Sequence, residues 1–249
     1  MSSAFTHQGM NPLSTSPAAA SDDERPRRRA GRETVSLVIP LYNEEEVIDI
    51  LIGELETFRK SRPEVTEVVL VDDGSRDRTV ESVRRRTELL SGYTLVSLSR
   101  NFGHQIAVTA GLEFVRTDAA IIMDADLQDP LEVAERMIDR WREGYDVVYG
   151  VRSEREGEGF MKKATAKMFY RFFRWITELD MPLDTGDFRL VSRDVIDAYS
   201  RIGEQDPFVR GLISWLGFNQ VGVTYERHAR VAGSTKYPWR RMMDLAFKA

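Results

Sequence analysis

Short apolar runs that alternate with longer amphipathic stretches limit the folds open to this chain more than any other feature. The runs cover residues 35–39, 68–71, 95–98, 120–123 and 147–149. Between the first two runs, apolar residues recur at helical spacing on one face: Val47, Ile48, Leu51, Ile52, Leu55 and Phe58. Because successive strands joined by helices pair in parallel, the pattern predicts an α/β fold with a mainly parallel central sheet.

The composition excludes several kinds of site. A chain of 249 residues with 42% hydrophobic content suits one α/β domain with an appendage, and a net charge of -5 argues against nucleic-acid binding. With 0 cysteines, a metal would be a hard cation on oxygen ligands, Mg²⁺ or Mn²⁺. No stretch approaches the roughly 20 apolar residues of a spanning helix, and the N-terminus lacks the apolar run of a secretory signal. We therefore expect that the chain as given does not cross a membrane.

Composition also divides the chain into three parts. Residues 1–33 are rich in Ser, Pro, Ala and Arg and predict a disordered tail, either simply solvated or in contact with anionic lipid. Residues 34–235 predict one domain with halves at 34–150 and 151–235. Residues 236–249, with Trp239, Arg240 and Arg241, are typical of a juxtamembrane segment, which could be truncated before transmembrane helices.

The loop after the first apolar run, Pro40-Leu-Tyr-Asn-Glu-Glu-Glu46, is acidic. A dinucleotide site needs glycines and a bare helix start at this point, and the glutamates would repel phosphate, so dinucleotide binding is disfavoured. We predict that Asn43 and Glu46 cap the next helix. We expect Pro40, Tyr42 and Glu44 to face a base or a ribose.

The second apolar run ends in Asp72-Asp-Gly-Ser75-Arg-Asp77. A carboxylate at the end of a strand can accept hydrogen bonds from a base or ribose, and Gly74 permits a tight turn. Ser75 or Asp77 is predicted to cap the next helix. A simple turn explains this composition equally well.

The fourth apolar run leads directly into Asp124-Ala-Asp126. Two carboxylates at this spacing can converge on a hard divalent cation, which takes its other ligands from water and substrate phosphates. Gln128 adds a further oxygen ligand. The next helix is predicted to begin with a capping box at Asp129, Pro130 and Glu132. The sequence therefore predicts a cation site in a loop held by a capped helix.

Residues 160–179 predict an amphipathic helix. Its basic side chains share one face: Lys163, Lys167, Arg171 and Arg174. Its apolar side chains lie toward the opposite face: Met161, Met168, Phe172, Trp175 and Ile176. This pattern is typical of a helix in a membrane interface, and an ordinary surface helix packed on the domain is the alternative.

Together these residues resemble the family 2 glycosyltransferases, and within them the polyprenyl-phosphate group. That group includes dolichol-phosphate mannose synthase and the bacterial bactoprenol-phosphate glucosyltransferases. The resemblance runs from about Val35 to the end of the chain. It depends on motifs that occur in order: Pro40-Leu-Tyr-Asn-Glu44, Val71-Asp-Asp-Gly-Ser75, Arg100-Asn-Phe-Gly-His-Gln105, Asp124-Ala-Asp-Leu-Gln-Asp-Pro130, Gly186-Asp-Phe-Arg-Leu190 and Gly233-Ser-Thr-Lys-Tyr237.

The resemblance implies a nucleotide-diphospho-sugar transferase (GT-A, Rossmann-like) fold with amphipathic interfacial helices near the C-terminus. It implies transfer of a hexose, with inversion, from a UDP-glucose-like or GDP-mannose-like sugar donor to polyprenyl phosphate at the cytoplasmic face of the membrane. The residues expected to bind the sugar donor are Pro40, Tyr42, Asn43, Glu44, Asp72, Asp73, Gln105, Asp124, Ala125 and Asp126. Asp72 would lie near the base and Asp124 near the ribose. The metal would be held by Asp126, Gln128 and Asp124.

The acceptor side is expected to supply cations, because two anionic phosphates must approach each other. The residues expected at the acceptor phosphate are Arg152, Lys167, Arg189, Arg210, Arg230, Ser234 and Lys236. The resemblance implies that Asp187 and Asp126 are the catalytic residues. The second pKa of a phosphate monoester is about 6, so we expect Asp187 to orient groups more than to remove a proton. A structural aspartate in a turn is the alternative.

Two rival functions share the first half of the chain. One is a family 2 transferase that acts on a polysaccharide or a protein, against which the absence of a Gln-x-x-Arg-Trp segment counts. The other is a non-catalytic scaffold that binds nucleotide sugars at a membrane. The sequence leaves a homo-oligomer open.

Overall fold

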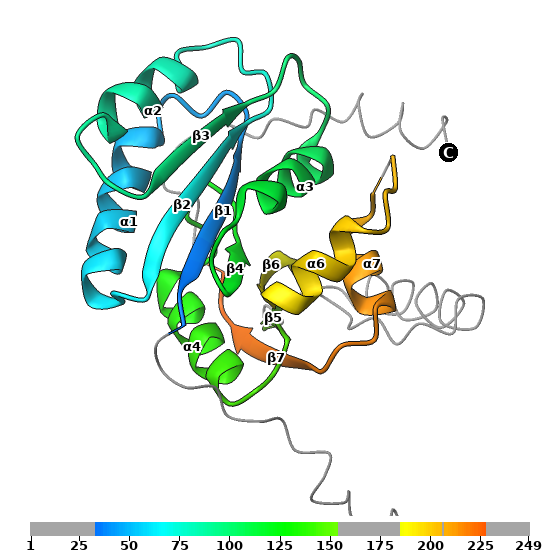
Figure 1. The fold of residues 1–249 in the computed structure, drawn as a ribbon. Coiled ribbons are helices and arrows are strands. Elements are labelled where there is room, and N and C mark those ends of the chain that lie inside the picture. The colour runs from blue at the N-terminus through cyan, green and yellow to red at the C-terminus, as the bar shows by residue number, and fades with distance from the viewer. Residues whose placement is uncertain (1–32, 154–184, 206, 228–249) are drawn as a thin grey trace, which may run out of the picture.

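The computed structural model describes residues 33–153, 185–205 and 207–227 (Figure 1). The strands are β1 Val35–Leu41, β2 Val65–Asp72, β3 Tyr93–Ser97, β4 Ala119–Ile122, β5 Val147–Arg152, β6 Thr185–Ser192 and β7 Gln220–Tyr225. The helices of the described ranges are α1 Ile48–Ser61, α2 Thr79–Thr87, α3 His104–Phe114, α4 Leu131–Arg142, α6 Arg193–Ser200 and α7 Val209–Trp215. None of these helices combines the length and apolar character needed to cross a membrane.

All of these strands belong to one 7-stranded sheet in the order β3-β2-β1-β4-β6-β5-β7. Parallel pairs join β1 to β2 and β4, β2 to β3, and β5 to β7. Strand β6 runs antiparallel to both β4 and β5. The predicted α/β class and mainly parallel sheet are confirmed. The five apolar runs all became strands, but they did not predict β6 and β7, whose sequences mix polar residues and glycine with the apolar ones.

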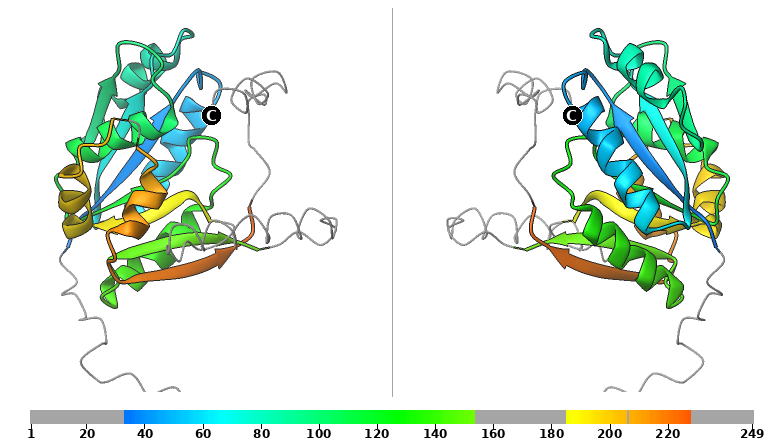
Figure 2. Two further views of the ribbon diagram at one scale, coloured as in Figure 1. Left: turned by 90° about the vertical axis from the view of Figure 1, so that its right-hand side faces the viewer. Right: turned by 90° about the vertical axis from the view of Figure 1, so that its left-hand side faces the viewer.

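Helices cover both faces of the sheet (Figure 2). Because successive side chains of a strand point to opposite faces, β1 contributes Leu37 and Ile39 to one core and Val38 to the other. The first core packs against α1, α2 and α4, and the second packs against α3, α6 and α7. The result is an α/β/α arrangement in which both faces of the central strands are buried.

The predicted caps of helices α1 and α4 require correction. Helix α1 begins at Ile48 with Val47 at the N-cap position, so Asn43 and Glu46 do not cap it. Helix α4 has Pro130 at its N-cap, so the predicted capping box of Asp129 and Glu132 does not form. The physical reason is tertiary in each case: the side chains of Asn43 and Asp129 bond to other loops and strands.

At the start of α2, Arg78 occupies the N-cap position, which was predicted for Ser75 or Asp77. The Ser75 hydroxyl instead accepts the Asn43 N–H at 2.9 Å, across to the first loop. Asp77 Oδ1 does accept the N–H of Thr79, the first residue of the helix, at 3.0 Å. The tight turn predicted at Gly74 is confirmed by its φ of +67°.

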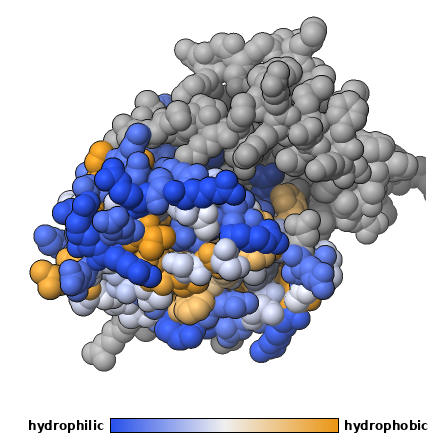
Figure 3. Space-filling model, turned by 90° about the horizontal axis from the view of Figure 1, so that it is seen from above, coloured by the Kyte–Doolittle hydropathy of each residue, from blue (hydrophilic) through white to orange (hydrophobic). Residues whose placement is uncertain are grey.

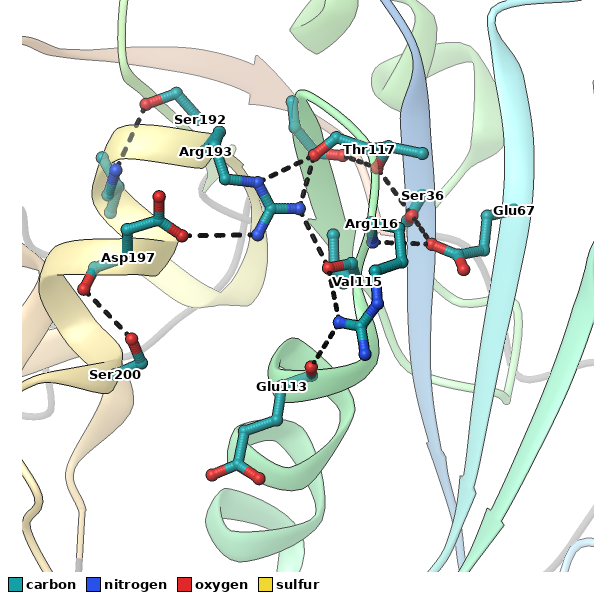
Figure 4. A network of polar contacts seen from close by, with 12 residues as sticks. Ser36, Glu67, Glu113, Val115, Arg116, Thr117, Ser192, Arg193, Asp197 and Ser200 are labelled. Atoms are coloured by element: carbon teal, nitrogen blue, oxygen red, sulfur yellow. Dashed lines mark hydrogen bonds and ion pairs between the residues drawn. The ribbon is translucent and has the colours of Figure 1, made fainter.

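A polar network closes the edge of the sheet where the parallel strands begin (Figure 4). Arg193, the first residue of α6, donates from Nε to the Thr117 carbonyl at 3.0 Å and from Nη2 to the Val115 carbonyl at 3.0 Å. The Ser36 hydroxyl lies 2.7 Å from the Thr117 hydroxyl and donates to Glu67. The network therefore ties α6 and the end of β6 to the loop that enters β4.

Replacing Arg193 with Ala is expected to lower the free energy of unfolding by about 2 kcal/mol, because two backbone carbonyls lose a charged hydrogen-bond donor. Urea unfolding measures the loss. Arg136→Ala is the matched control, since Arg136 is exposed on α4 and alanine suits a helix as well as arginine. Equal stability of the two variants would contradict the assigned role of the network.

Candidate active site

Chemically active side chains gather at the opposite edge, where the parallel strands end. The loops after β1, β2 and β4 lie there, together with the first residues of the antiparallel β6. Ile122 of β4 pairs with Arg189 of the antiparallel β6. Asp124 follows Ile122 by two residues and Asp187 precedes Arg189 by two, so both lie next to each other at this edge of the sheet. The described residues on the face seen from above, at the same end, are mainly hydrophilic with apolar residues between them (Figure 3).

The centre of this edge is acidic. Asp126 is 8% exposed and Asp129 is 2% exposed, whereas the Asp124 side chain is 37% exposed. Burial raises the pKa of Asp124, and the negative charges of Asp129, Asp126 and Asp187 raise it further, against the opposing effect of His104. Like charges crowded in this way are stabilised by a bound cation.

The loop that carries these carboxylates makes a sharp turn. Asp126 Oδ1 accepts the N–H of Gln128 at 3.1 Å, and Leu127 between them has a φ of +53°. Such a conformation is uncommon for a leucine and is held by the surrounding contacts. No three acidic, histidine or cysteine side chains of the described residues form a metal-binding group. The donor set of Asp124, Asp126 and Gln128 suits a hard divalent cation that takes its remaining ligands from a substrate.

His104 and Gln105, the first residues of α3, contact the carboxylate of Asp187. Gln105 Nε2 donates to Asp187 Oδ2 at 2.9 Å, and His104 Nε2 lies 3.2 Å from the same oxygen. His104 Nε2 is also 3.9 Å from Asp124 Oδ1. The sequence prediction missed His104, although it stands beside Gln105 in a motif already singled out.

Opposite charges surround Asp187. Burial alone would raise its pKa, but the hydrogen bond and charge of His104, with the charges of Arg189 and Arg210, hold the pKa of Asp187 below its ordinary value. Burial lowers the pKa of Arg189 to about 10, and its Nη2 donates to the Gly186 carbonyl at 3.0 Å. Arg189 is 3% exposed, so its effect on the site is the electrostatic one of a buried positive charge near Asp187.

Tyr225, at the end of β7, links the acidic loop to β5. Its hydroxyl donates to Asp129 Oδ1 at 2.5 Å and accepts from Arg152 Nε at 3.4 Å. Burial, with the hydrogen bond to Asp129, raises the pKa of Tyr225 to about 12, so the hydroxyl keeps its proton. Arg227 lies 3.9 Å from both Asp124 and Asp129. The sequence prediction missed Tyr225 and Arg227, which no motif marks.

Tyr225→Phe is expected to lower the free energy of unfolding by about 2 kcal/mol, because the buried Asp129 loses its hydroxyl donor. Tyr199→Phe is the matched control, since Tyr199 is also buried but its hydroxyl pairs with the neutral Thr109 at 2.8 Å. That control is expected to lose about 1 kcal/mol. Urea unfolding compares the two, and a smaller loss in Tyr225→Phe would contradict the assignment.

The loops after β1 and β2 are hydrogen-bonded to each other. Asn43 Oδ1 accepts the Arg76 N–H at 2.8 Å, and Asp72 Oδ1 accepts the Ser75 N–H at 3.1 Å. The residues predicted to contact the sugar donor lie at or beyond the ends of β1, β2 and β4 and at the start of α3: Pro40, Tyr42, Asn43, Glu44, Asp72, Asp73, Gln105, Asp124, Ala125 and Asp126. Four of the predicted acceptor residues lie outside the described residues: Lys167, Arg230, Ser234 and Lys236.

Comparison with known proteins shows the family. The model of glycosyl transferase family 2 matches residues 36–200, which cover β1 from its second residue and all of β2 to β6. The chain belongs to glycosyl transferase family 2. Within this family, it is 48% identical over 211 residues to the "Uncharacterized glycosyltransferase YkcC" of Bacillus subtilis (strain 168). It is 38% identical over 215 residues to the "Bactoprenol glucosyl transferase" of Shigella phage SfX.

These alignments cover 85% and 86% of the family 2 chain, but only 65% of the Bacillus protein and 70% of the phage protein. The predicted resemblance to the bactoprenol branch is confirmed by the name of the phage relative.

Solved structures share the fold of this family 2 chain. The mannosyltransferase PcManGT from Pyrobaculum calidifontis, in complex with GDP-Man and Mn²⁺, matches with a TM-score of 0.55 at 21% identity, over 78% of this chain and 55% of the other. Glucosyl-3-phosphoglycerate synthase from Mycobacterium tuberculosis, in complex with Mn²⁺, UDP-glucose and phosphoglyceric acid, matches with a TM-score of 0.55 at 18% identity, over 86% and 76%. The predicted GT-A fold is confirmed. The segments predicted to form interfacial helices, residues 160–179 and the C-terminal part of the chain, lie outside the described residues.

Proposed function

We propose that this protein transfers a hexose from a nucleotide diphosphate sugar to polyprenyl phosphate at the cytoplasmic face of a membrane. The observation that carries the proposal is the meeting of Asp124, Asp126 and Asp187 at the carboxyl edge of the sheet. The relatives named bactoprenol glucosyl transferase support the lipid acceptor. The solved complexes that contain a nucleotide sugar and Mn²⁺ support the sugar donor and the metal.

A divalent cation, Mg²⁺ or Mn²⁺, would be held by Asp124, Asp126 and Gln128. When bound, it supplies positive charge for the diphosphate of the leaving nucleotide. The loop geometry suits this task, because the turn at Leu127 and the bond from Gln128 to Asp126 hold the loop in one conformation. The loops after β1 and β2, which are joined by hydrogen bonds between Asn43 and both Ser75 and Arg76, would hold the base and ribose.

On the acceptor side, most of a phosphate monoester is dianionic at neutral pH, because its second pKa is about 6. The phosphate is therefore its own nucleophile, and one of its oxygens forms the bond to the anomeric carbon as the bond to the diphosphate oxygen breaks. Attack from the side opposite the leaving group inverts the anomeric configuration. Arg152, Arg189 and Arg210 supply positive charge to this side of the site, directly or through Asp187.

The test incubates the purified protein with Mn²⁺, a short polyprenyl phosphate and either UDP-glucose or GDP-mannose. Mass spectrometry of the lipid is expected to show one added hexose with one of the two sugar donors, and EDTA is expected to prevent it. NMR of the product reports the anomeric configuration. Transfer only to protein or polysaccharide, or full lipid transfer in EDTA, would overturn the proposal.

A further inference from the structure

The start of helix α3 is held firmly at the end of β2. Both carboxylate oxygens of Asp73 accept hydrogen bonds from the segment before the helix: from Asn101 Nδ2 at 2.9 Å, from the Phe102 N–H at 2.7 Å and from the Gly103 N–H at 2.9 Å. Bonds to an ionised acceptor are stronger than neutral ones. Gly103 has a φ of +104°, which directs the chain from this segment into the helix. Asp73 therefore fixes the position of the next two residues, His104 and Gln105.

Those two residues bond to the same oxygen of Asp187. Gln105 Nε2 lies 2.9 Å from Asp187 Oδ2, and His104 Nε2 lies 3.2 Å from it. The other oxygen, Oδ1, is buried and has no hydrogen-bond partner among the described residues. A buried acceptor without a partner is costly and uncommon, so the two contacts to Oδ2 are the side-chain contacts that hold this carboxylate.

A hydrogen bond to helix α7 determines the orientation of the Gln105 side-chain amide. Gln105 Oε1 accepts the N–H of Val209, the first residue of α7, at 3.0 Å. Because a backbone N–H can only donate, the oxygen of the amide must face Val209 and the NH₂ group must face Asp187. Gln105 thus connects β6 to α7, where Arg210 lies next to Val209. Both polar atoms of Gln105 are engaged within the protein.

We propose that His104 and Gln105 are positioning residues that hold Asp187 by Oδ2 as a fixed anion beside Asp124 at the carboxyl edge of the sheet. The inference rests on the proposed function and deepens it. Hydrogen bonds that a carboxylate accepts stabilise its charged form, so we expect Asp187 to stay an anion that orients the acceptor phosphate through its cations, rather than to act as a general base. Gln105 acts through Asp187 and does not contact the sugar donor, which differs from the sequence prediction.

A double-mutant cycle tests this assignment. Gln105→Met keeps the length of the side chain and removes both hydrogen bonds, and it is expected to lower kcat by about 10- to 100-fold. The Kd for UDP-glucose with Mn²⁺, measured by calorimetry, is expected to stay within about twofold. In an Asp187→Asn background, Gln105→Met is expected to lower kcat less than about threefold further, because the two residues act as one unit. Glu113→Gln, exposed at the other end of α3, is the control and should match the wild type.

Two outcomes would overturn the assignment. One is an equal loss of kcat from Gln105→Met in both backgrounds, which would place its action elsewhere. The other is a Kd for UDP-glucose weakened more than about tenfold with kcat unchanged, which would make Gln105 a contact of the sugar donor. Asp187→Glu, which moves the carboxylate by one methylene, serves as the second background if Asp187→Asn does not fold.

A spectroscopic measurement keeps this inference separate from the proposed function. The side-chain NH₂ resonances of Gln105 are expected to shift and to exchange faster with solvent in Asp187→Asn than in the wild type. Unchanged resonances would overturn the positioning role, whatever the enzyme does with lipid. If the wild-type protein makes no glycolipid but these resonances do change, the proposed function fails and the contact between Gln105 and Asp187 stands.

Discussion

Replacing Asp126 with Asn is expected to lower the rate of hexose transfer by about a thousandfold while the protein stays folded. The amide oxygen of asparagine can still accept the Gln128 N–H, so the turn of the loop is kept and only the negative charge is lost. Loss of metal assistance to a leaving diphosphate costs several kcal/mol, and each 1.4 kcal/mol of barrier is about tenfold in rate. Product formation is followed by mass spectrometry of the lipid at saturating sugar donor.

The same variant is expected to bind Mn²⁺ more weakly, which calorimetry measures without any turnover. Asp139→Asn is the matched control, because Asp139 is an exposed carboxylate on α4 that pairs with Arg62 at 3.0 Å, away from the loop. It should keep wild-type activity. Wild-type transfer in Asp126→Asn, with unchanged Mn²⁺ affinity, would refute the metal role of this aspartate.

Gly74→Ala is expected to destabilise the fold by more than about 3 kcal/mol. Gly74 has a φ of +67°, and a Cβ atom there would lie 2.4 Å from the backbone carbon of Arg100 and 2.7 Å from the N of Asn101. These are backbone atoms, so they cannot move aside without shifting the segment that Asp73 holds. Because this segment precedes His104, transfer activity should fall with stability.

Gly53→Ala is the matched control for this substitution. Gly53 is exposed within α1, and a Cβ atom there would meet nothing within 4 Å. Alanine is the better helix former by about 1 kcal/mol, so this variant should be slightly more stable than the wild type. Urea unfolding measures both variants. A Gly74→Ala protein as stable as Gly53→Ala would show that the turn tolerates a side chain.

Local patterns were sufficient for the central strands and for the acidic loop. Strands buried on both faces read as continuous apolar runs, so residues 35–39 and 120–123 revealed β1 and β4 without any knowledge of their neighbours. The position of Asp124 and Asp126 followed from the end of the β4 run, because ligands gather where parallel strands end. The family resemblance extended this to Asp187, but it did not say what would contact it.

Helix caps were predicted less well, because the N–H groups at a helix start compete with other hydrogen-bond donors for the capping side chain. Asp129 had the sequence of an N-cap, yet its carboxylate is bound by Tyr225, which is 96 residues away in sequence. Asn43 likewise bonds to Arg76 in the neighbouring loop instead of starting α1. A polar side chain near a helix start takes the strongest donor that folding brings to it, and a local pattern cannot contain that donor.

By itself, the sequence determined the class of fold, the family and the acidic loop after β4, because burial and turn chemistry act over a few neighbouring residues. Only the tertiary structure decided how Asp187 is held. Strand β6 had to insert antiparallel beside β4, which sets Asp187 next to Asp124. Gln105 then meets Asp187 across 82 residues and Val209 across 104 residues. Contacts at such separations depend on the order of strands in the sheet, and no local spacing encodes that order.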